Sequence, residues 1–174
     1  MQDHANTPTA DLRVEFGTRP KAPPLPDVTP AQRAKGRGLA AIHAHYLRDM
    51  ARIAMVIDRI EAGDTPPAHL AQIVLAADMT QNLRAFGSLC GQGCQMLMMH
   101  HNIEESHMFP EIEGKATLFA TLIARLRAEH EVVHTLLDRL ADCATRLTEK
   151  PDAAGFAETR ATFDALHRAI ASHF

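Results

Sequence analysis

The longest amphipathic segment of the chain covers residues 119–147 and reads FATLIARLRAEHEVVHTLLDRLADCATRL. Its apolar residues recur at alternating steps of four and three, the repeat of helices that pack nearly parallel to their neighbours. The segment predicts a long helix from about Lys115 to Thr148 with a single buried face. That face comprises Phe119, Ile123, Leu126, His130, Val133, Leu137, Leu140, Ala144 and Leu147.

The same repeat occurs nearer the N-terminus. A helix is predicted to begin at Thr29-Pro30, because threonine is a good cap and proline suits the first helical position. Gln32, three residues after Thr29, completes a capping box. The helix is expected to end at Gly63-Asp64, and its apolar face comprises Leu39, His43, Tyr46, Met50, Ile53, Ile57 and Ile60.

Two more helices are predicted. One starts after Thr65 and runs to about Phe109, with a kink near Gly91 and a stop at Pro110. The other follows a turn and cap at Asp152. Its apolar face comprises Phe156, Thr159, Phe163, Leu166, Ile170 and His173.

These four helices and their short connections predict an all-α fold, an up-down-up-down four-helix bundle over residues 29–174. No segment shows the sustained period of two that is typical of a strand. Residues 1–28 are predicted to form an extended, proline-rich tail, since prolines crowd residues 20–26 and disfavour helix. The sequence leaves open whether this tail packs on the bundle.

The composition narrows the class of protein. The net charge of −3 gives no reason to expect a nucleic-acid or membrane partner. No apolar run approaches the roughly 20 residues that a spanning helix needs, and three cysteines without a secretory leader argue against a disulfide scaffold. We therefore expect a cytoplasmic protein. Its 11 histidines favour metal binding.

Three histidines interrupt apolar helix faces: His43, His130 and His173. A buried imidazole needs partners for its ring nitrogens, and a single one is usually a hydrogen-bonded core residue. Histidines on several helices that face one axis are better explained together by a metal ion, because neutral imidazole is the commonest metal ligand.

The segment HHNIEE, residues 100–105, adds a carboxylate. His100 and Glu104 are four residues apart and project from one helix face, where they can hold one ion or two neighbouring ions. His101 and Glu105 form a similar pair on an adjacent face. The alternative is a solvated polar pair, which the apolar neighbours on both sides disfavour.

The spacing of four recurs at His130 and His134 in the next helix. Glu129 and Glu131 flank His130, and we interpret both as surface charges rather than as groups that orient the ring. Imidazole and carboxylate ligands suit iron, manganese and zinc alike. Zinc usually takes four ligands, so more than four histidines together with a glutamate would fit two ions better than one zinc.

These motifs resemble a known family. HHNIEESHMFP, residues 100–110, resembles the H-x-x-x-E-E-x-x-[LM]-F-P signature of the hemerythrin and HHE cation-binding domains. EHEVVH, residues 129–134, resembles their third-helix H-x-x-x-H, and IHAHYLRDM, residues 42–50, resembles their first helix with its single histidine. The resemblance covers about residues 35–174. It implies two non-haem iron ions that bind or sense dioxygen, nitric oxide or peroxide.

Matching the family's ligands residue by residue gives a predicted set of metal ligands. His45 is the rival of His43 in the first helix, but it shares its face with arginines. The resemblance therefore implies His43, His100, Glu104, His130, His134 and His173.

The sequence departs from the family at its last ligand. The family has a carboxylate four or five residues after the fourth-helix histidine, whereas this sequence ends at Phe174. Either the natural protein continues past this residue, or the site is incomplete. Without that carboxylate the second metal position is expected to be weaker, which leaves a single-ion or water-completed site open. Two alternatives therefore stand beside a binding protein or sensor. One is a di-iron enzyme acting on peroxide or nitric oxide, and the other is a structural bundle with a vestigial site.

Overall fold

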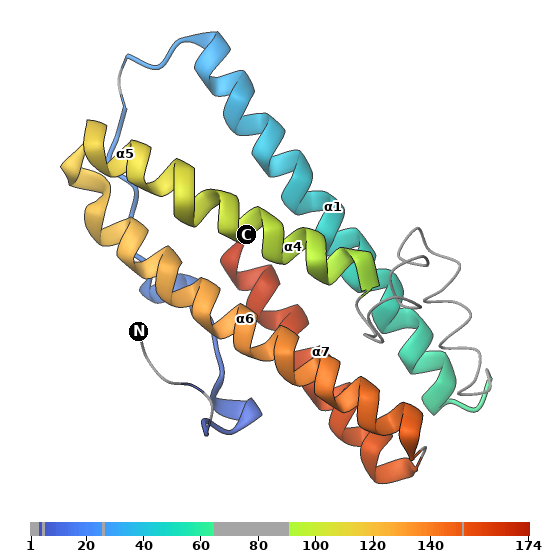
Figure 1. Cartoon of the computed structure of the whole chain (residues 1–174). Coiled ribbons are helices and arrows are strands. Elements are labelled where there is room, and N and C mark those ends of the chain that lie inside the picture. Colours follow the sequence, from blue (N-terminus) through green and yellow to red (C-terminus); the bar gives the residue numbers. More distant parts are fainter. Residues whose placement is uncertain (1–3, 5, 26, 65–90, 151) are drawn as a thin grey trace.

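The computed structural model describes residues 4, 6–25, 27–64, 91–150 and 152–174. Helix α1 spans Pro30–Glu61, α4 spans Gly91–Ile103, α6 spans Ala120–Glu149 and α7 spans Ala153–His173. Successive helices run in opposite directions along one long axis (Figure 1). Within the described ranges the regular structure is helical and contains no strand, so the predicted all-α up-down-up-down bundle is confirmed.

The first helix begins at the predicted cap. The backbone amide of Thr29 donates to Oε1 of Gln32 over 2.8 Å, and the amide of Gln32 donates back to Oγ1 of Thr29 over 3.3 Å. This reciprocal pair confirms the capping box. At the other end Gly63 has a φ of 77°, a left-handed conformation that glycine adopts without steric cost.

The second helical segment does not stop at Pro110. Helix α4 passes into a π-helical turn, η3 (Glu104–Met108), and then into α5 (Phe109–Lys115). The predicted stop is therefore wrong. Proline is tolerated in the first turn of a helix, and the change of hydrogen-bond register in η3 gives α5 a first turn of its own. The predicted part of this helix before residue 91 lies outside the described residues.

The last two helices form the most extensive contact among the helices that the structure describes. A short 3₁₀ turn, η4 (Thr117–Phe119), precedes α6. Asp152 caps α7 as predicted, because its carboxylate accepts a hydrogen bond of 2.7 Å from the amide of Gly155. Side chains from both helices are fully buried between them, among them Leu136, Leu140 and Leu166.

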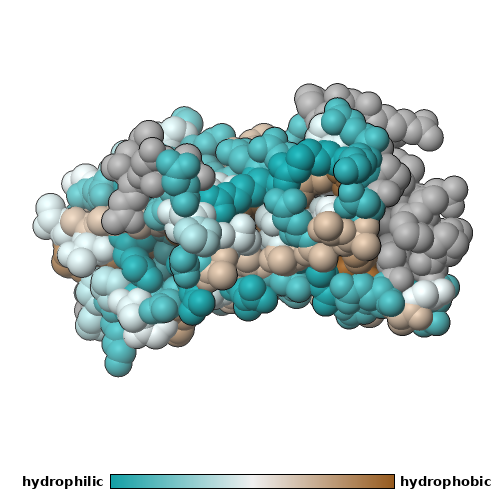
Figure 2. Space-filling model, turned by 90° about the horizontal axis from the view of Figure 1, so that it is seen from below, coloured by the Kyte–Doolittle hydropathy of each residue, from teal (hydrophilic) through white to brown (hydrophobic). Residues whose placement is uncertain are grey.

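The residues before α1 pack on the bundle. Two short 3₁₀ turns, η1 (Thr9–Asp11) and η2 (Phe16–Thr18), flank Leu12 and Val14, which are buried in the same core as the helices. None of the described helices has the length and apolarity needed to cross a membrane. On the face displayed in Figure 2, hydrophilic residues cover most of the surface and hydrophobic residues form small areas between them.

Candidate metal centre

Among the residues that the structure describes, two groups of side chains inside the bundle could hold a metal ion. The first comprises His101, His130 and His173, one residue each from α4, α6 and α7, and all three are buried. In each group, one ligand atom per residue lies within 4.8 Å of the others. The second group comprises His43, His100 and Glu104. The four helices therefore bring six donor groups together where a soluble protein usually buries apolar side chains.

Each ring of the first group is held through its Nδ1 atom. His173 Nδ1 donates to Glu129 Oε2 and His130 Nδ1 donates to Glu105 Oε1, both over 2.8 Å. The Nδ1 atom of His101 lies 3.1 Å from Nε2 of His134, in a hydrogen bond between the two rings. Such partners set the tautomer and orientation of a ligating histidine. They leave the three Nε2 atoms for a common ligand.

Two of these Nε2 atoms are buried without a hydrogen-bond partner among the described residues, those of His101 and His130. An unsatisfied buried polar atom costs about 1–3 kcal/mol, so native proteins rarely keep one without a reason. The Nε2 atom of His130 also lies 3.2 Å from Glu104 Oε2. A carboxylate that faces imidazole nitrogens needs a proton or a metal ion between them, and one metal ion would satisfy these atoms together.

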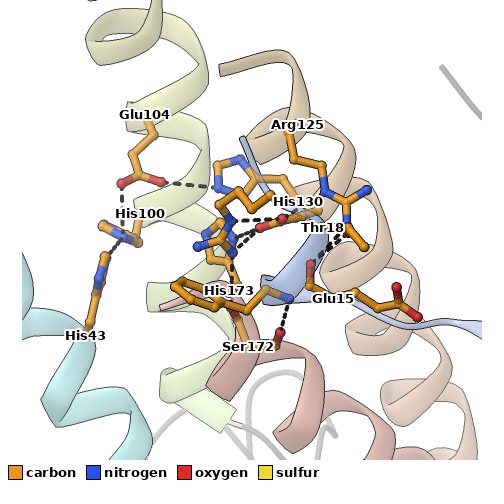
Figure 3. Close-up of polar contacts among 12 residues, drawn as sticks. Glu15, Thr18, His43, His100, Glu104, Arg125, His130, Ser172 and His173 are labelled. Carbon is orange, nitrogen blue, oxygen red and sulfur yellow. Dashed lines mark hydrogen bonds and ion pairs between the residues drawn. The ribbon is translucent and has the colours of Figure 1, made fainter. Parts of the chain in front are cut away.

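Glu104 connects the two groups, as Figure 3 shows. Its Oε1 atom lies 3.4 Å from Nε2 of His100, which in turn lies 3.0 Å from Nε2 of His43. Its Oε2 atom faces His130 in the first group. A carboxylate whose two oxygens face two separate clusters of imidazole nitrogens has the arrangement of a bridging ligand between two ions. Glu104 is also the first residue of the π turn η3, a kind of turn that often marks functional sites.

A protein-family comparison agrees with this geometry. The family model of the hemerythrin HHE cation binding domain matches residues 37–174, which include every residue of both groups. The chain belongs to the hemerythrin family. Among curated proteins and among solved structures, nothing matches it significantly. As a hemerythrin HHE cation-binding domain it is a metal-binding protein, and its buried histidines and glutamate supply suitable ligands.

Five of the six ligands predicted from sequence lie in the two groups of the hemerythrin centre: His43, His100, Glu104, His130 and His173. His134, the sixth, lies against His101 instead, and His101 occupies the first group. Helix α4 contacts both α1 and α6, so neighbouring residues on two of its faces can both point inward. The signal in the sequence was the pair His101 and Glu105, which has the same spacing as His100 and Glu104.

The interpretation of Glu129 as a surface charge is wrong. Its side chain is 2% exposed, and its carboxylate accepts hydrogen bonds from Arg19, Arg125 and His173. Burial raises the pKa of Glu129, but the hydrogen bonds from His173 and Arg19 outweigh it and hold the pKa below its usual value. The carboxylate is therefore charged at neutral pH and accepts the Nδ1 proton of His173.

Burial also favours the neutral form of four imidazoles in the centre. It lowers the pKa of His43 to about 4, with a further contribution from His100, and it lowers the pKa of His100, His101 and His173. For Glu104, burial raises the pKa, but the neighbouring His130 and His100 more than compensate and lower it. Neutral imidazoles around an ionised carboxylate are in the protonation states that bind a metal ion.

The metal-free protein is expected to lose stability as the pH falls from 6.5 towards 4. The lowered pKa of His43 means that the unfolded chain binds more protons than the folded one in this window. The contribution of His43 to the free energy of unfolding is complete above pH 6.5. It declines as the pH falls and is lost once the pH has passed through the folded pKa of about 4. One pKa unit is worth about 1.4 kcal/mol, so the fall from 6.5 to about 4 sets an upper limit of about 3.5 kcal/mol. Because the ring is only partly buried, we expect a loss of roughly 2 kcal/mol.

Urea denaturation of the chelator-treated protein at several pH values measures this loss. The variant His43→Gln lacks the titrating ring and should show a smaller decrease over the same window. An equal decrease in the two proteins would show that the burial of His43 does not govern the acid sensitivity.

Proposed function

We propose that this chain binds two non-haem iron ions and uses them to bind or sense dioxygen, nitric oxide or peroxide. The observation that carries the proposal is the position of Glu104, with one oxygen towards each group of imidazoles. When bound, a pair of ferrous ions supplies electrons and a coordination position for a small diatomic or peroxide ligand. The protein's part is to hold the ions, orient their ligands and exclude water.

The numbers of donors in the two groups favour an unequal pair of positions. Within the described residues, the first group offers three imidazoles and one oxygen of Glu104, whereas the second offers two imidazoles and the other oxygen. The position with fewer protein ligands leaves more room for an exogenous ligand. We therefore assign the small-molecule ligand to the side of His43 and His100.

Aromatic side chains cover the centre. Phe174 stacks on the ring of His43 with 3.9 Å between centroids, and Phe109 stacks on His130 at 5.5 Å. Tyr46 is 8% exposed, and its ring lies 5.9 Å from that of His100. Burial and the charge of Glu104 raise the pKa of this phenol, so it stays protonated. These side chains limit access of water, which favours retention of a small ligand over its release as a reduced product.

Iron content and optical spectra test this proposal. The chain, loaded with Fe²⁺ under anaerobic reducing conditions, should hold about two ions and develop a ligand-to-iron charge-transfer band on exposure to air. The control variant His45→Ala should take up as much iron as the wild type, because His45 is 65% exposed and pairs with Asp49 at the surface. A wild-type protein that takes up no iron would refute the proposal. Sustained turnover of peroxide or nitric oxide would instead support the enzyme alternative.

Metal removal is expected to destabilise the protein. An ion that binds only the folded state, at a free concentration 100 times its dissociation constant, adds about 2.7 kcal/mol to the free energy of unfolding. Each kcal/mol shifts Tm by roughly 2–4 °C at this chain length. Chelation of the iron-loaded protein should therefore lower Tm by at least about 5 °C in thermal denaturation. An unchanged Tm would favour the structural bundle with a vestigial site.

A further inference from the structure

The segment before α1 reaches the metal centre. We call residues 9–19 the N-terminal arm; it packs through Leu12 and Val14 into the core beside α7. The backbone amide of Phe16 donates to Oγ of Ser172 over 3.0 Å, which fixes the arm next to His173. Arg139 of α6 anchors the start of the arm through a 3.2 Å hydrogen bond to Oγ1 of Thr9. The arm is therefore held at both ends.

Arg19, the last residue of the arm, forms hydrogen bonds with the carboxylate of Glu129, which orients His173. Its Nε atom donates to Glu129 Oε1 over 3.0 Å, and its Nη2 atom donates to Glu129 Oε2. This two-point contact of guanidinium and carboxylate is the most directional ion pair available to side chains. Nη2 also donates to the carbonyl oxygen of Ser172 over 3.0 Å. Arg19 thus contacts Glu129, the hydrogen-bond partner of His173, and Ser172, the residue before His173.

Glu129 transmits this contact to the imidazole. Its Oε2 atom accepts hydrogen bonds from both Arg19 Nη2 and His173 Nδ1. Arg125 of α6 joins Glu129 to the arm. It donates to Glu129 Oε1 over 3.1 Å and to Oγ1 of Thr18 in the arm over 3.0 Å (Figure 3). Glu129 and His173 are 2% and 5% exposed at their side chains, so water is a poor substitute for these partners.

We propose that Arg19 is a positioning residue of the metal centre, which holds His173 through Glu129 and so couples docking of the N-terminal arm to metal affinity. The proposal rests on the proposed metal-binding function. Loss of Arg19 leaves Glu129 held by Arg125 at Oε1 alone. Its Oε2 atom, which accepts the Nδ1 proton of His173, then has no second donor among the described residues to fix it, and the ring loses a fixed partner that keeps its Nε2 atom available. Coupling between two sites is reciprocal, so a metal ion on His173 should also tighten the arm against the bundle.

The first test needs no metal. Long-range ¹H–¹⁵N spectra of the histidine rings in the metal-free protein report which nitrogen of His173 carries the proton. The wild type should show a proton on Nδ1, whereas Arg19→Gln should show a mixture of the two tautomers. Arg13→Gln is the matched control, because Arg13 lies on the same arm, is exposed and donates to the carbonyl oxygen of Ala10. A wild-type tautomer ratio in Arg19→Gln would overturn the proposal.

The second test measures the affinity for Co²⁺ by competition with a chromophoric chelator. Changes in groups that orient a metal ligand typically cost 10–100-fold in affinity, and we expect about this loss for Arg19→Gln and none for Arg13→Gln. Arg19→Lys keeps the charge but not the two parallel donors, so it should fall between them. It also decides the question if Arg19→Gln does not fold. An affinity for Co²⁺ that is equal in all four proteins would contradict the coupling.

The reciprocal effect should be measurable as protection of the arm from protease. Trypsin cleavage after Arg13 should be slower in the Co²⁺-loaded wild type than in the metal-free protein, and Arg19→Gln should lose most of this protection. Equal cleavage rates with and without Co²⁺ in the wild type would contradict the coupling. Absence of Co²⁺ binding in the wild type would refute the proposed function instead, while the tautomer comparison would still decide whether Arg19 positions His173.

Discussion

Replacement of Glu104 by alanine is expected to remove both metal positions at once. The two oxygens of this carboxylate face the two groups of imidazoles, at 3.4 Å from His100 and 3.2 Å from His130. Without it the centre keeps five imidazole rings but no carboxylate to offset the charge of two cations. Substitution of a residue that only hydrogen-bonds to a metal ligand typically lowers the metal affinity 10–100-fold. For Glu104, a ligand itself, we therefore expect a loss of more than about 100-fold. Iron analysis after loading under reducing conditions measures it.

Two further variants make this result specific. Glu104→Gln keeps the shape of the side chain and removes its charge, so it should also bind little iron. Glu158→Ala is the same kind of change at an exposed carboxylate that pairs with Arg146, and it should bind as the wild type does. We also expect His69→Ala to leave metal binding unchanged; His69 lies outside the described residues. Normal iron content in Glu104→Ala would show that the ions lie elsewhere or are held without this carboxylate.

The second large effect concerns two neighbouring histidines with different roles. His101→Ala is expected to empty the three-imidazole position, because it removes one of the three Nε2 atoms that converge there. His134→Ala should keep both ions and lower the affinity by about tenfold, since His134 contacts His101 through a 3.1 Å hydrogen bond. The family resemblance alone implies the reverse, with His134 as the ligand.

The comparison is made on the two variants side by side. Titration with Co²⁺ should give one tight equivalent fewer in His101→Ala and an unchanged stoichiometry in His134→Ala. The opposite pattern would restore His134 to the ligand set and assign His101 to its support. Because both substitutions remove the same ring in the same bundle, a difference between them reports position rather than the loss of an imidazole in general.

The elements of the fold were predictable because they depend on local signals. The repeat of four and three along residues 119–147 specifies one buried helix face, and the caps at Thr29 and Asp152 depend on side chains within three residues. The continuation through Pro110 was not predictable from these rules. It depends on the register change in η3, which no short motif in the sequence predicts.

The candidate site was predictable only where its residues share a helix face or a family motif. Spacing relates His100 to Glu104, but it cannot show that both His100 and His101 face inward, because that depends on helices on two sides of α4. The contact of Arg19 with Glu129 joins residues 110 positions apart. Such a long-range ion pair leaves no periodic trace in the sequence, so Glu129 looked like an ordinary charge beside His130.

The central claim is that imidazoles from four helices, together with Glu104, hold two metal ions. An anomalous difference map from crystals of the iron-loaded protein, with data collected on both sides of the iron absorption edge, tests this most directly. We predict two iron peaks, one beside the Nε2 atoms of His101, His130 and His173 and one beside His43 and His100, with Glu104 between them. Iron peaks away from these side chains, or none at all, would contradict the account.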